Sequence, residues 1–233
     1  MHRFYLENIN HRDNLIEIND PRIVQQCQKV LRMKPGSRLS VFNEKGNEWA
    51  LELIEVDRKK LIGNVTECIE RKTESPIELH LYQAIPKKPA LFEWVIQKAT
   101  ELGVSTIYPL ITRRTEGRKL LKFDRLQMIA IEAAEQSGRV RVPIIQHPIT
   151  FEEVPKKKPV YIAYEFEKGN ELSNFLPEIK KSRVAHILVG PEGGFDTNEI
   201  MAGKKAEAKS FSLGPRILRT ETAGIVVVAQ TLI

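Results

Sequence analysis

Arginine and glutamate side chains gather at two glycine- and proline-rich turns near the C-terminus. The first turn, residues 190–194, reads Gly-Pro-Glu-Gly-Gly, and the second carries Arg216, Arg219 and Glu221. An arginine guanidinium is a planar donor that can bind phosphate or stabilise an oxyanion. A glutamate beside it can accept a proton if its pKa is raised or a water relays the proton, whereas pairing with arginine lowers that pKa. These residue types indicate charge stabilisation or proton transfer, and the alternative is an internal Arg–Glu pair that only holds the loop.

The first turn does not fit the known phosphate-binding motifs. It lacks the Gly-x-Gly-x-x-Gly spacing of dinucleotide folds and the Gly-Lys-Ser/Thr ending of a P-loop. Its charged residue, Glu192, is a poor neighbour for a polyphosphate. The glycines favour a ligand with little negative charge that the backbone approaches closely, or else they simply make a tight turn.

Both turns lie between an expected strand and an expected helix. Strands are predicted at 184–189 and 209–213, with helices at 197–207 and after Arg219, where Thr220 can cap the helix. An α/β protein binds its ligand at the carboxyl ends of such strands. Further strands are predicted at 77–84, 104–111, 142–146 and 159–164, and further helices at 90–102, 123–137 and 169–177. This alternation predicts a mostly parallel sheet with helices on both faces.

Residues 1–72 have a different pattern. Short strands are predicted at 14–18, 38–42, 49–56 and 60–65, with one helix over 21–31 that begins at a proline. A small β-barrel with one helix is the simplest package for these elements. Residues 71–76 are polar and end in proline, which is typical of a linker. The chain therefore divides into predicted domains at 1–72 and 73–233.

The overall composition is compatible with nucleic-acid binding. The net charge is +6 and the pI is about 9.2, a mild excess of positive charge that permits a polyanionic partner. Cys27 and Cys68 show no metal-ligand spacing and are read as reduced, buried thiols in a cytoplasmic protein. The histidines also lack ligand spacing, so no metal site is predicted. No apolar run is long enough to cross a membrane, and the polar N-terminus has no signal-peptide core.

Four motifs together resemble one known family. Residues 97–104, 132–139, 189–195 and 213–223 are similar, in order, to the signature of the RsmE family of SPOUT methyltransferases. The resemblance spans most of residues 75–233. It is looser in the N-terminal part, where residues 2–5 and 31–36 carry it.

The resemblance implies a fold, an activity and partners. It implies a SPOUT-type sheet with a deep trefoil knot, a PUA-like barrel in residues 1–72 that helps to hold RNA, and S-adenosylmethionine as cofactor. The implied reaction is methylation of uridine N3 in 16S ribosomal RNA of the small subunit. The β-branched residues of 222–233 alone favour a strand, but the family implies a helix that forms a homodimer. Burial of that helix within its own chain is the alternative.

The resemblance also implies roles for single residues. Arg219 is expected to stabilise negative charge on the uracil as N3 loses its proton, and Glu221 or Glu192 is the candidate proton acceptor. The residues expected around S-adenosylmethionine are Leu188, Val189, Gly190, Glu192, Gly193, Gly194, Leu213, Gly214, Ile217, Leu218, Thr222 and Ala223. The basic residues expected to contact RNA, unless they form solvated faces, are Arg3, Arg32, Lys34, Arg113, Arg114, Arg118 and Arg139.

Two other functions stay open at this point. A SPOUT methyltransferase could modify another RNA position, such as a ribose 2′-hydroxyl. A non-catalytic RNA-binding module of ribosome assembly would need only the basic residues. The intact glycine turns argue against the module, because a pure RNA binder has no need of a cofactor pocket.

Overall fold

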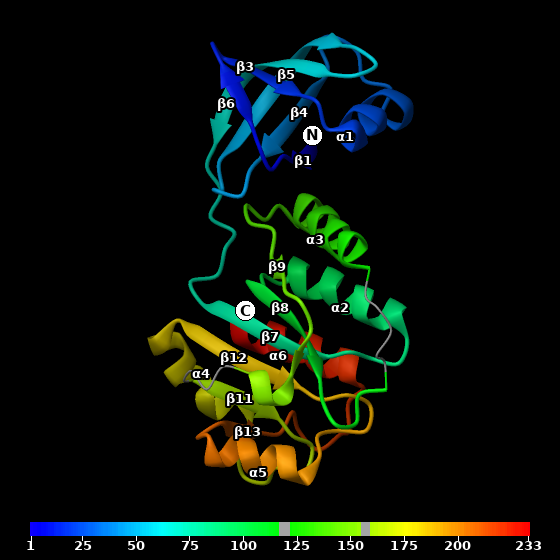
Figure 1. The fold of residues 1–233 in the computed structure, drawn as a ribbon. Helices are drawn as coiled ribbons and strands as arrows, with labels where there is room; N and C mark the ends of the chain where they lie inside the picture. The colour runs from blue at the N-terminus through cyan, green and yellow to red at the C-terminus, as the bar shows by residue number, and fades with distance from the viewer. Residues whose placement is uncertain (117–121, 155–158) are drawn as a thin grey trace. The chain divides into compact units, whose positions relative to one another are not determined.

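The computed structural model describes residues 1–116, 122–154 and 159–233, which divide into two compact units (Figure 1). The first unit is Met1–Glu74 together with Ala134–Val142, and the second is Ser75–Ala133 together with Pro143–Ile233. These units differ from the predicted domains in two respects. The first boundary follows Glu74 and not residue 72. The segment Ala134–Val142, which sequence analysis placed with the C-terminal domain, belongs to the first unit.

The first unit is built on a mostly antiparallel sheet with the strand order β1-β4-β5-β6-β3-β2. Its strands are β1 (His2–Tyr5), β2 (Asn10–Arg12), β3 (Leu15–Ile18), β4 (Arg38–Phe42), β5 (Glu48–Val56) and β6 (Leu61–Ile69). Only the β1–β4 pair is parallel. The predicted helix is a short α1 (Pro21–Gln25), capped by the Asp20 side chain, that continues as a π-helical turn, η1 (Gln26–Val30).

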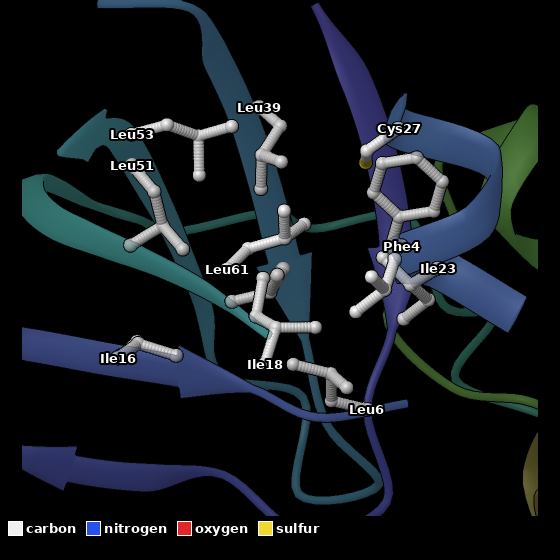
Figure 2. Close-up of a cluster of buried hydrophobic side chains, with 12 residues drawn as sticks. Phe4, Leu6, Ile16, Ile18, Ile23, Cys27, Leu39, Leu51, Leu53 and Leu61 are labelled. Carbon is white, nitrogen blue, oxygen red and sulfur yellow. The ribbon is translucent and has the colours of Figure 1, made fainter. Parts of the chain in front are cut away.

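One hydrophobic core fills the first unit (Figure 2). Phe4 of β1, Ile16 of β3, Leu39 of β4, Leu51 of β5 and Leu61 of β6 are all almost fully buried in it. Side chains alternate across a strand, so one face of each strand points into this cluster. Because five of the six strands, from β1 at one edge to β3 near the other, contribute to a single core, the sheet wraps around it, and the predicted barrel-like N-terminal fold is confirmed.

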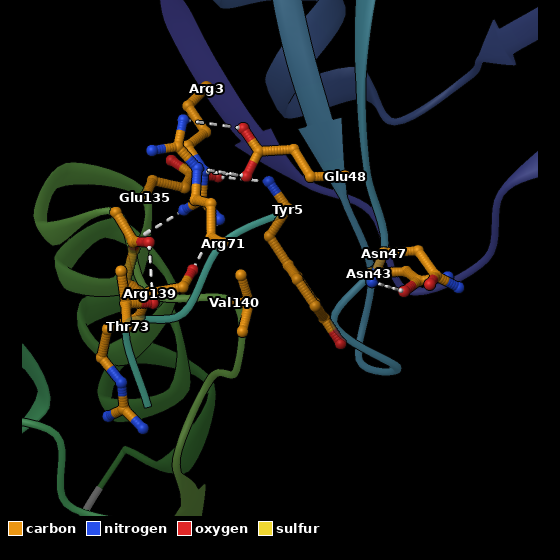
Figure 3. A network of polar contacts seen from close by, with 12 residues as sticks. Arg3, Tyr5, Asn43, Asn47, Glu48, Arg71, Thr73, Glu135, Arg139 and Val140 are labelled. Carbon is orange, nitrogen blue, oxygen red and sulfur yellow. Dashed lines mark hydrogen bonds and ion pairs between the residues drawn. The ribbon is translucent and has the colours of Figure 1, made fainter. Parts of the chain in front are cut away.

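A buried ion network corrects one RNA prediction in the first unit (Figure 3). Glu48 pairs with Arg3 at 3.0 Å and with Arg71 at 2.7 Å. Arg3 also donates to the carbonyl oxygens of Ala134 and Arg139, and its side chain is only 7% exposed. Arg3 was expected to contact RNA, but its guanidinium is buried and bonded to Glu48 and to two backbone carbonyls within the first unit.

Arg139 is corrected for the same reason. Its Nη2 pairs with Glu74 Oε2 at 2.6 Å, and its side chain is almost fully buried. The Glu74 carboxylate also accepts hydrogen bonds from the backbone N–H groups of Val140 and Arg141. Arg139 therefore fastens the 134–142 segment to residue 74 within the first unit and does not present its charge to a polyanion.

The second unit contains a parallel sheet with the strand order β10-β8-β7-β12-β11-β13, and β9 pairs with β8 beside β10. Its strands are β7 (Glu78–Ala84), β8 (Thr106–Ile111), β9 (Ile144–Ile145), β10 (Ile149–Thr150), β11 (Val160–Ala163), β12 (Val184–Val189) and β13 (Lys209–Phe211). Its helical elements are α2 (Pro89–Glu101), the main part of α3 (Phe123–Ser137), η2 (Phe151–Glu153), α4 (Leu172–Ser182), α5 (Thr197–Lys205) and α6 (Thr220–Leu232).

Helices cover both faces of this sheet, as predicted. Tyr82 of β7 lies in register with Leu188 of β12, and both pack in one cluster with Ile200 of α5. The next residue of β7, Gln83, points to the opposite face, where its side chain bonds to Thr220 of α6. Helices α2 and α4 contact α6 and so lie on that second face. The trefoil knot stays a prediction.

Two helices differ from what the residue pattern alone predicts. Residues 220–232 form a helix despite their β-branched side chains, as the family resemblance implied. The helix predicted at 169–177 is instead Leu172–Ser182, because Glu171 and Asn174 make a reciprocal cap at its start. It continues past Pro177, and the burial of Ile179 offsets the backbone hydrogen bond that the proline removes.

The two cysteines differ in burial, and this corrects the expectation that both are buried. Cys27 is fully buried and Cys68 is exposed. Burial raises the pKa of the Cys27 thiol to about 11. The reactive species is the thiolate, so Cys27 stays protonated and inert near neutral pH.

Thiol labelling is therefore expected to separate the two residues. At pH 8, Ellman's reagent should modify one thiol per folded chain and two per chain unfolded in guanidinium. Cys68→Ser should abolish the fast reaction, whereas rapid labelling of two thiols in the folded protein would contradict the burial of Cys27.

Among the helices of the described residues, none is both long and apolar enough to span a membrane.

Candidate functional site

A cavity of about 430 Å³ lies at the carboxyl ends of four neighbouring strands, β7, β12, β11 and β13. Its wall is closed by the start of α6. The residues around it are Lys87, Lys88, Leu91, Ala163, Tyr164, Glu165, Val189, Gly190, Pro191, Glu192, Gly194, Ser212, Leu213, Gly214, Arg216, Ile217, Leu218, Arg219, Thr220, Glu221 and Ala223. The structure thus brings both glycine turns to one pocket within the second unit, where the strand–turn–helix order placed it.

The first loop, residues 190–195, follows β12 and needs its glycines for space and for backbone conformation. Gly194 has a φ of +66°, and its N–H donates to the Pro191 carbonyl to close a tight turn. A Cβ on Gly194 would meet a carboxylate oxygen of Glu165, and one on Gly190 would lie 3.1 Å from the Phe195 ring. The glycines both make the turn and bring the backbone close to the cavity.

The second loop, residues 212–219, connects β13 to α6. Gly214 has a φ of +99°, and a Cβ there would have no heavy atom within 4 Å. Its backbone therefore faces open space at the cavity wall. Leu213 and Leu218 add apolar surface, and the side chain of Ile217 is largely exposed beside them.

A buried hydroxyl ties the two loops together. Thr220 was expected to cap α6, but the cap position is Arg219, and the Thr220 hydroxyl instead donates to the Gly190 carbonyl at 2.5 Å. Gln83 Nε2 in turn donates to Thr220 Oγ1 at 2.8 Å. This chain of hydrogen bonds fixes the start of α6 against the first loop. Sequence reasoning missed Gln83, although a polar residue in an apolar strand was a usable signal.

The charged residues of the pocket do not form the internal pair that sequence analysis kept as an alternative. Within the described part of the chain, neither the Arg216 nor the Arg219 side chain makes a hydrogen bond or an ion pair, and both residues are exposed. Glu221 is buried at the start of α6 and lines the cavity. Glu192 accepts a hydrogen bond from the backbone N–H of Lys87 at 2.9 Å. Arg219 is therefore available to a ligand, whereas Glu192 is partly engaged.

Three residues expected around the cofactor do not line the cavity. Leu188 packs in the core beneath α5, Thr222 is exposed on α6, and the Gly193 carbonyl accepts a hydrogen bond from Arg114. In their place the structure adds Lys87, Lys88 and Leu91 from the connection after β7, and Ala163 to Glu165 at the end of β11. Lys87, Lys88 and Leu91 leave no local signal for this role, because they lie far from the two loops along the chain.

The remaining RNA candidates have different surroundings. Arg32 and Lys34 are exposed in the first unit. Arg113 and Arg114 follow β8 in the second unit and lie beside Asp196, next to the first loop. Arg118 lies outside the described residues.

Comparisons with known proteins identify the family. A model described as "RNA methyltransferase domain" matches residues 73–232, and one described as "RNA methyltransferase PUA domain" matches residues 27–66. The Ribosomal RNA small subunit methyltransferase E of Rickettsia conorii is 35% identical over 98% of this chain and 93% of its own length. The chain belongs to the ribosomal RNA small subunit methyltransferase E family. It is therefore an RNA methyltransferase with a PUA-like N-terminal fold.

Other members of the methyltransferase E family agree with this assignment. The Bacillus subtilis relative is 33% identical over 86% of this chain and 83% of its own length. A crystal structure of the Neisseria gonorrhoeae methyltransferase E, bound to S-adenosyl methionine, has a TM-score of 0.87 at 30% identity. It covers 99% of this chain and 96% of that one.

Proposed function

We propose that this chain methylates N3 of a uridine in 16S ribosomal RNA, with S-adenosylmethionine as the methyl donor. The names of the relatives support ribosomal RNA of the small subunit as the substrate, and the Neisseria gonorrhoeae structure supports the cofactor. The observation that carries the proposal is a cavity that joins both glycine loops to a buried Glu221 and to an Arg219 whose side chain has no partner among the described residues.

The cavity fits the cofactor in size and in chemistry. Its volume falls within the range of about 300–1,000 Å³ that is usual for small-molecule sites. Leu91, Val189 and Leu218 offer apolar surface to a nucleoside, and the open backbone at Gly214 allows close approach. The cofactor would be held by residues of the first loop, of the second loop and of the start of α6. When bound, the cofactor supplies an electrophilic methyl group on a sulfonium.

The protein's part is to present a nucleophilic nitrogen. N3 of uridine carries a proton and is a poor nucleophile until that proton leaves or is being removed. Arg219 is free of partners in the described structure, so its guanidinium can stabilise the charge that develops on the uracil oxygens. Glu221 is the candidate proton acceptor, directly or through a water molecule. The two loops fix the alignment that in-line transfer needs.

The decisive test is the identity of the methylated nucleoside. Small ribosomal subunits from a strain that lacks the enzyme would be incubated with the chain and S-adenosylmethionine, and the nucleosides analysed by mass spectrometry. We expect 3-methyluridine. A 2′-O-methylated nucleoside would point to the other RNA position, and failure to bind S-adenosylmethionine in calorimetry would leave only an RNA-binding module.

We further propose that the first unit and the exposed Arg32, Lys34, Arg113 and Arg114 hold the ribosomal RNA, and that the protein acts in the cytoplasm, where subunits are assembled. A PUA-like fold is the part that the family description associates with RNA methyltransferases. Long-range attraction from a net charge of +6 would speed RNA association at low salt.

We also propose a homodimer through α6. The helix packs on α2, α4 and β7 of its own chain, yet Ile225, Val226 and Ala229 remain partly exposed on it. Light scattering should give twice the chain mass of 26.7 kDa. A single-chain mass at micromolar concentration would count against the dimer.

Gly194→Ala is expected to weaken S-adenosylmethionine binding by about tenfold or more. The substitution puts a Cβ at a φ of +66°, which strains the first loop, and against the Glu165 carboxylate, which lines the cavity and must move aside. Gly36→Ala is the matched control, because Gly36 has a φ of +89° with no neighbour within 4 Å and lies in the first unit. Both variants carry similar backbone strain, and calorimetry should show lost affinity only for Gly194→Ala. Equal affinities in the two variants would exclude a role for the loop conformation in binding.

A further inference from the structure

We propose that Arg114 is a positioning residue for the cofactor loop, and not solely a contact for RNA. Its Nη1 donates to the Gly193 carbonyl at 2.8 Å, and its Nη2 lies 3.6 Å from Asp196 Oδ2. Gly193 and Asp196 lie within and directly after the first loop. One guanidinium therefore holds this loop at two points from outside the cavity.

The backbone that carries Arg114 is itself fixed. Thr112 and Thr115, both buried, bond to each other through backbone and hydroxyl groups and make a tight turn around Arg114. A short turn that is closed on both sides leaves the side chain few alternative directions. Its placement on the loop follows from this local structure and costs little ordering entropy.

A buried carboxylate joins the same turn to the loop from the other side. Glu199 accepts the backbone N–H of Arg113 on Oε1 at 2.9 Å and that of Asp196 on Oε2 at 2.7 Å. Asp196 in turn caps α5. The segment after β8 and the first loop thus form one connected structure, in which Arg114 supplies the outer link and Glu199 the inner one.

Arg113 provides a matched comparison within the same turn. It carries the same charge, and its side chain is 56% exposed against 48% for Arg114. Its link to Glu199 uses the backbone N–H, which alanine retains, and among the described residues its guanidinium approaches only Asp196, at 3.5 Å. Removing either arginine takes one positive charge from the surface proposed to bind RNA, but only Arg114→Ala releases the Gly193 carbonyl.

The inference rests on the proposed cofactor, and its test uses the full chain without RNA. Calorimetry with S-adenosylmethionine should show that Arg114→Ala raises the dissociation constant about tenfold, which corresponds to about 1.4 kcal/mol. Arg113→Ala should stay within about twofold of the wild type. Arg114→Lys keeps the charge but has no planar fork, and it should fall between the two. Thermal unfolding without ligand should be alike for the three variants.

The outcomes separate this inference from the proposed function. Wild-type chain that fails to bind S-adenosylmethionine would overturn both. If the wild type binds S-adenosylmethionine and the two variants Arg114→Ala and Arg113→Ala have the same dissociation constant, the positioning role of Arg114 alone would be overturned. If Arg114→Ala does not fold, an unchanged dissociation constant in Arg114→Lys would overturn it equally.

Discussion

Replacing Arg219 with alanine is expected to lower kcat for methyl transfer by about 10²–10³-fold, the usual cost of removing one preorganised donor to a developing negative charge. Arg219 lines the cavity at the start of α6 and is exposed, and its side chain has no partner among the described residues. Its removal therefore leaves no buried group unpaired, so the fold and the dissociation constant of S-adenosylmethionine should change little.

Arg216→Ala is the control for this experiment. It removes the same charge from the same loop, and Arg216 also lines the cavity without a partner in the described structure. A fall of less than about tenfold in the rate of methyl transfer by Arg216→Ala would show that the position of Arg219 matters, and not only the net charge of the loop. Single-turnover rates on small subunits, with saturating cofactor, measure the chemical step. A near-normal rate in Arg219→Ala would remove the residue from the mechanism.

Replacing Glu48 with alanine is expected to destabilise the protein by about 3–5 kcal/mol, because it leaves the buried Arg3 guanidinium without its counter-charge. The Glu48 side chain is fully buried between Arg3 and Arg71. Glu52→Ala breaks an exposed ion pair, in which the Arg38 side chain is 70% exposed and the Glu52 side chain 42% exposed. This substitution should lower the free energy of unfolding by about 1 kcal/mol or less. Urea unfolding at pH 7 compares the two variants, and similar losses would contradict the burial of the network.

The same network predicts a pH dependence with a definite sign. Burial disfavours the charged form of Glu48, but hydrogen bonds from Arg71 and the attraction of Arg3 outweigh it and lower the pKa of the carboxyl below 4.5. A lowered folded-state pKa means that the unfolded state binds more protons as the pH falls. The stability contributed by Glu48 is thus present above about pH 4.5 and lost below it. The difference in the free energy of unfolding between wild type and Glu48→Gln should become smaller as the pH is lowered.

Local pattern predicted the elements well where one face of a strand or helix decides the structure. The strand at Arg38–Phe42 was predicted at its observed bounds, and all of its residues after Arg38 are buried. At α6 the β-branched residues favour a strand, and tertiary burial on both α2 and the sheet overrides that preference. The family resemblance, which reflects tertiary context, gave the correct helix.

The pocket contains residues that the local sequence pattern does not predict. The glycine loops can be recognised from their composition, but Lys87 and Glu165 reach the cavity only because β7 and β11 flank β12 in the sheet. Arg3 and Arg114 are both basic and both were expected to contact RNA. Only the fold shows that one is buried against Glu48 and that the other holds a carbonyl of the first loop.

The chain enters the first unit twice, once at its beginning and again through Ala134–Val142. A fragment that ends at residue 74 would lack the carbonyl acceptors of Arg3 and the Arg139 partner of Glu74. The complementary fragment would keep Glu135 without its ion-pair partner Arg22, and Arg139 without Glu74. No single proteolytic cut can therefore yield two intact halves, and RNA affinities measured on either truncation would describe a damaged surface.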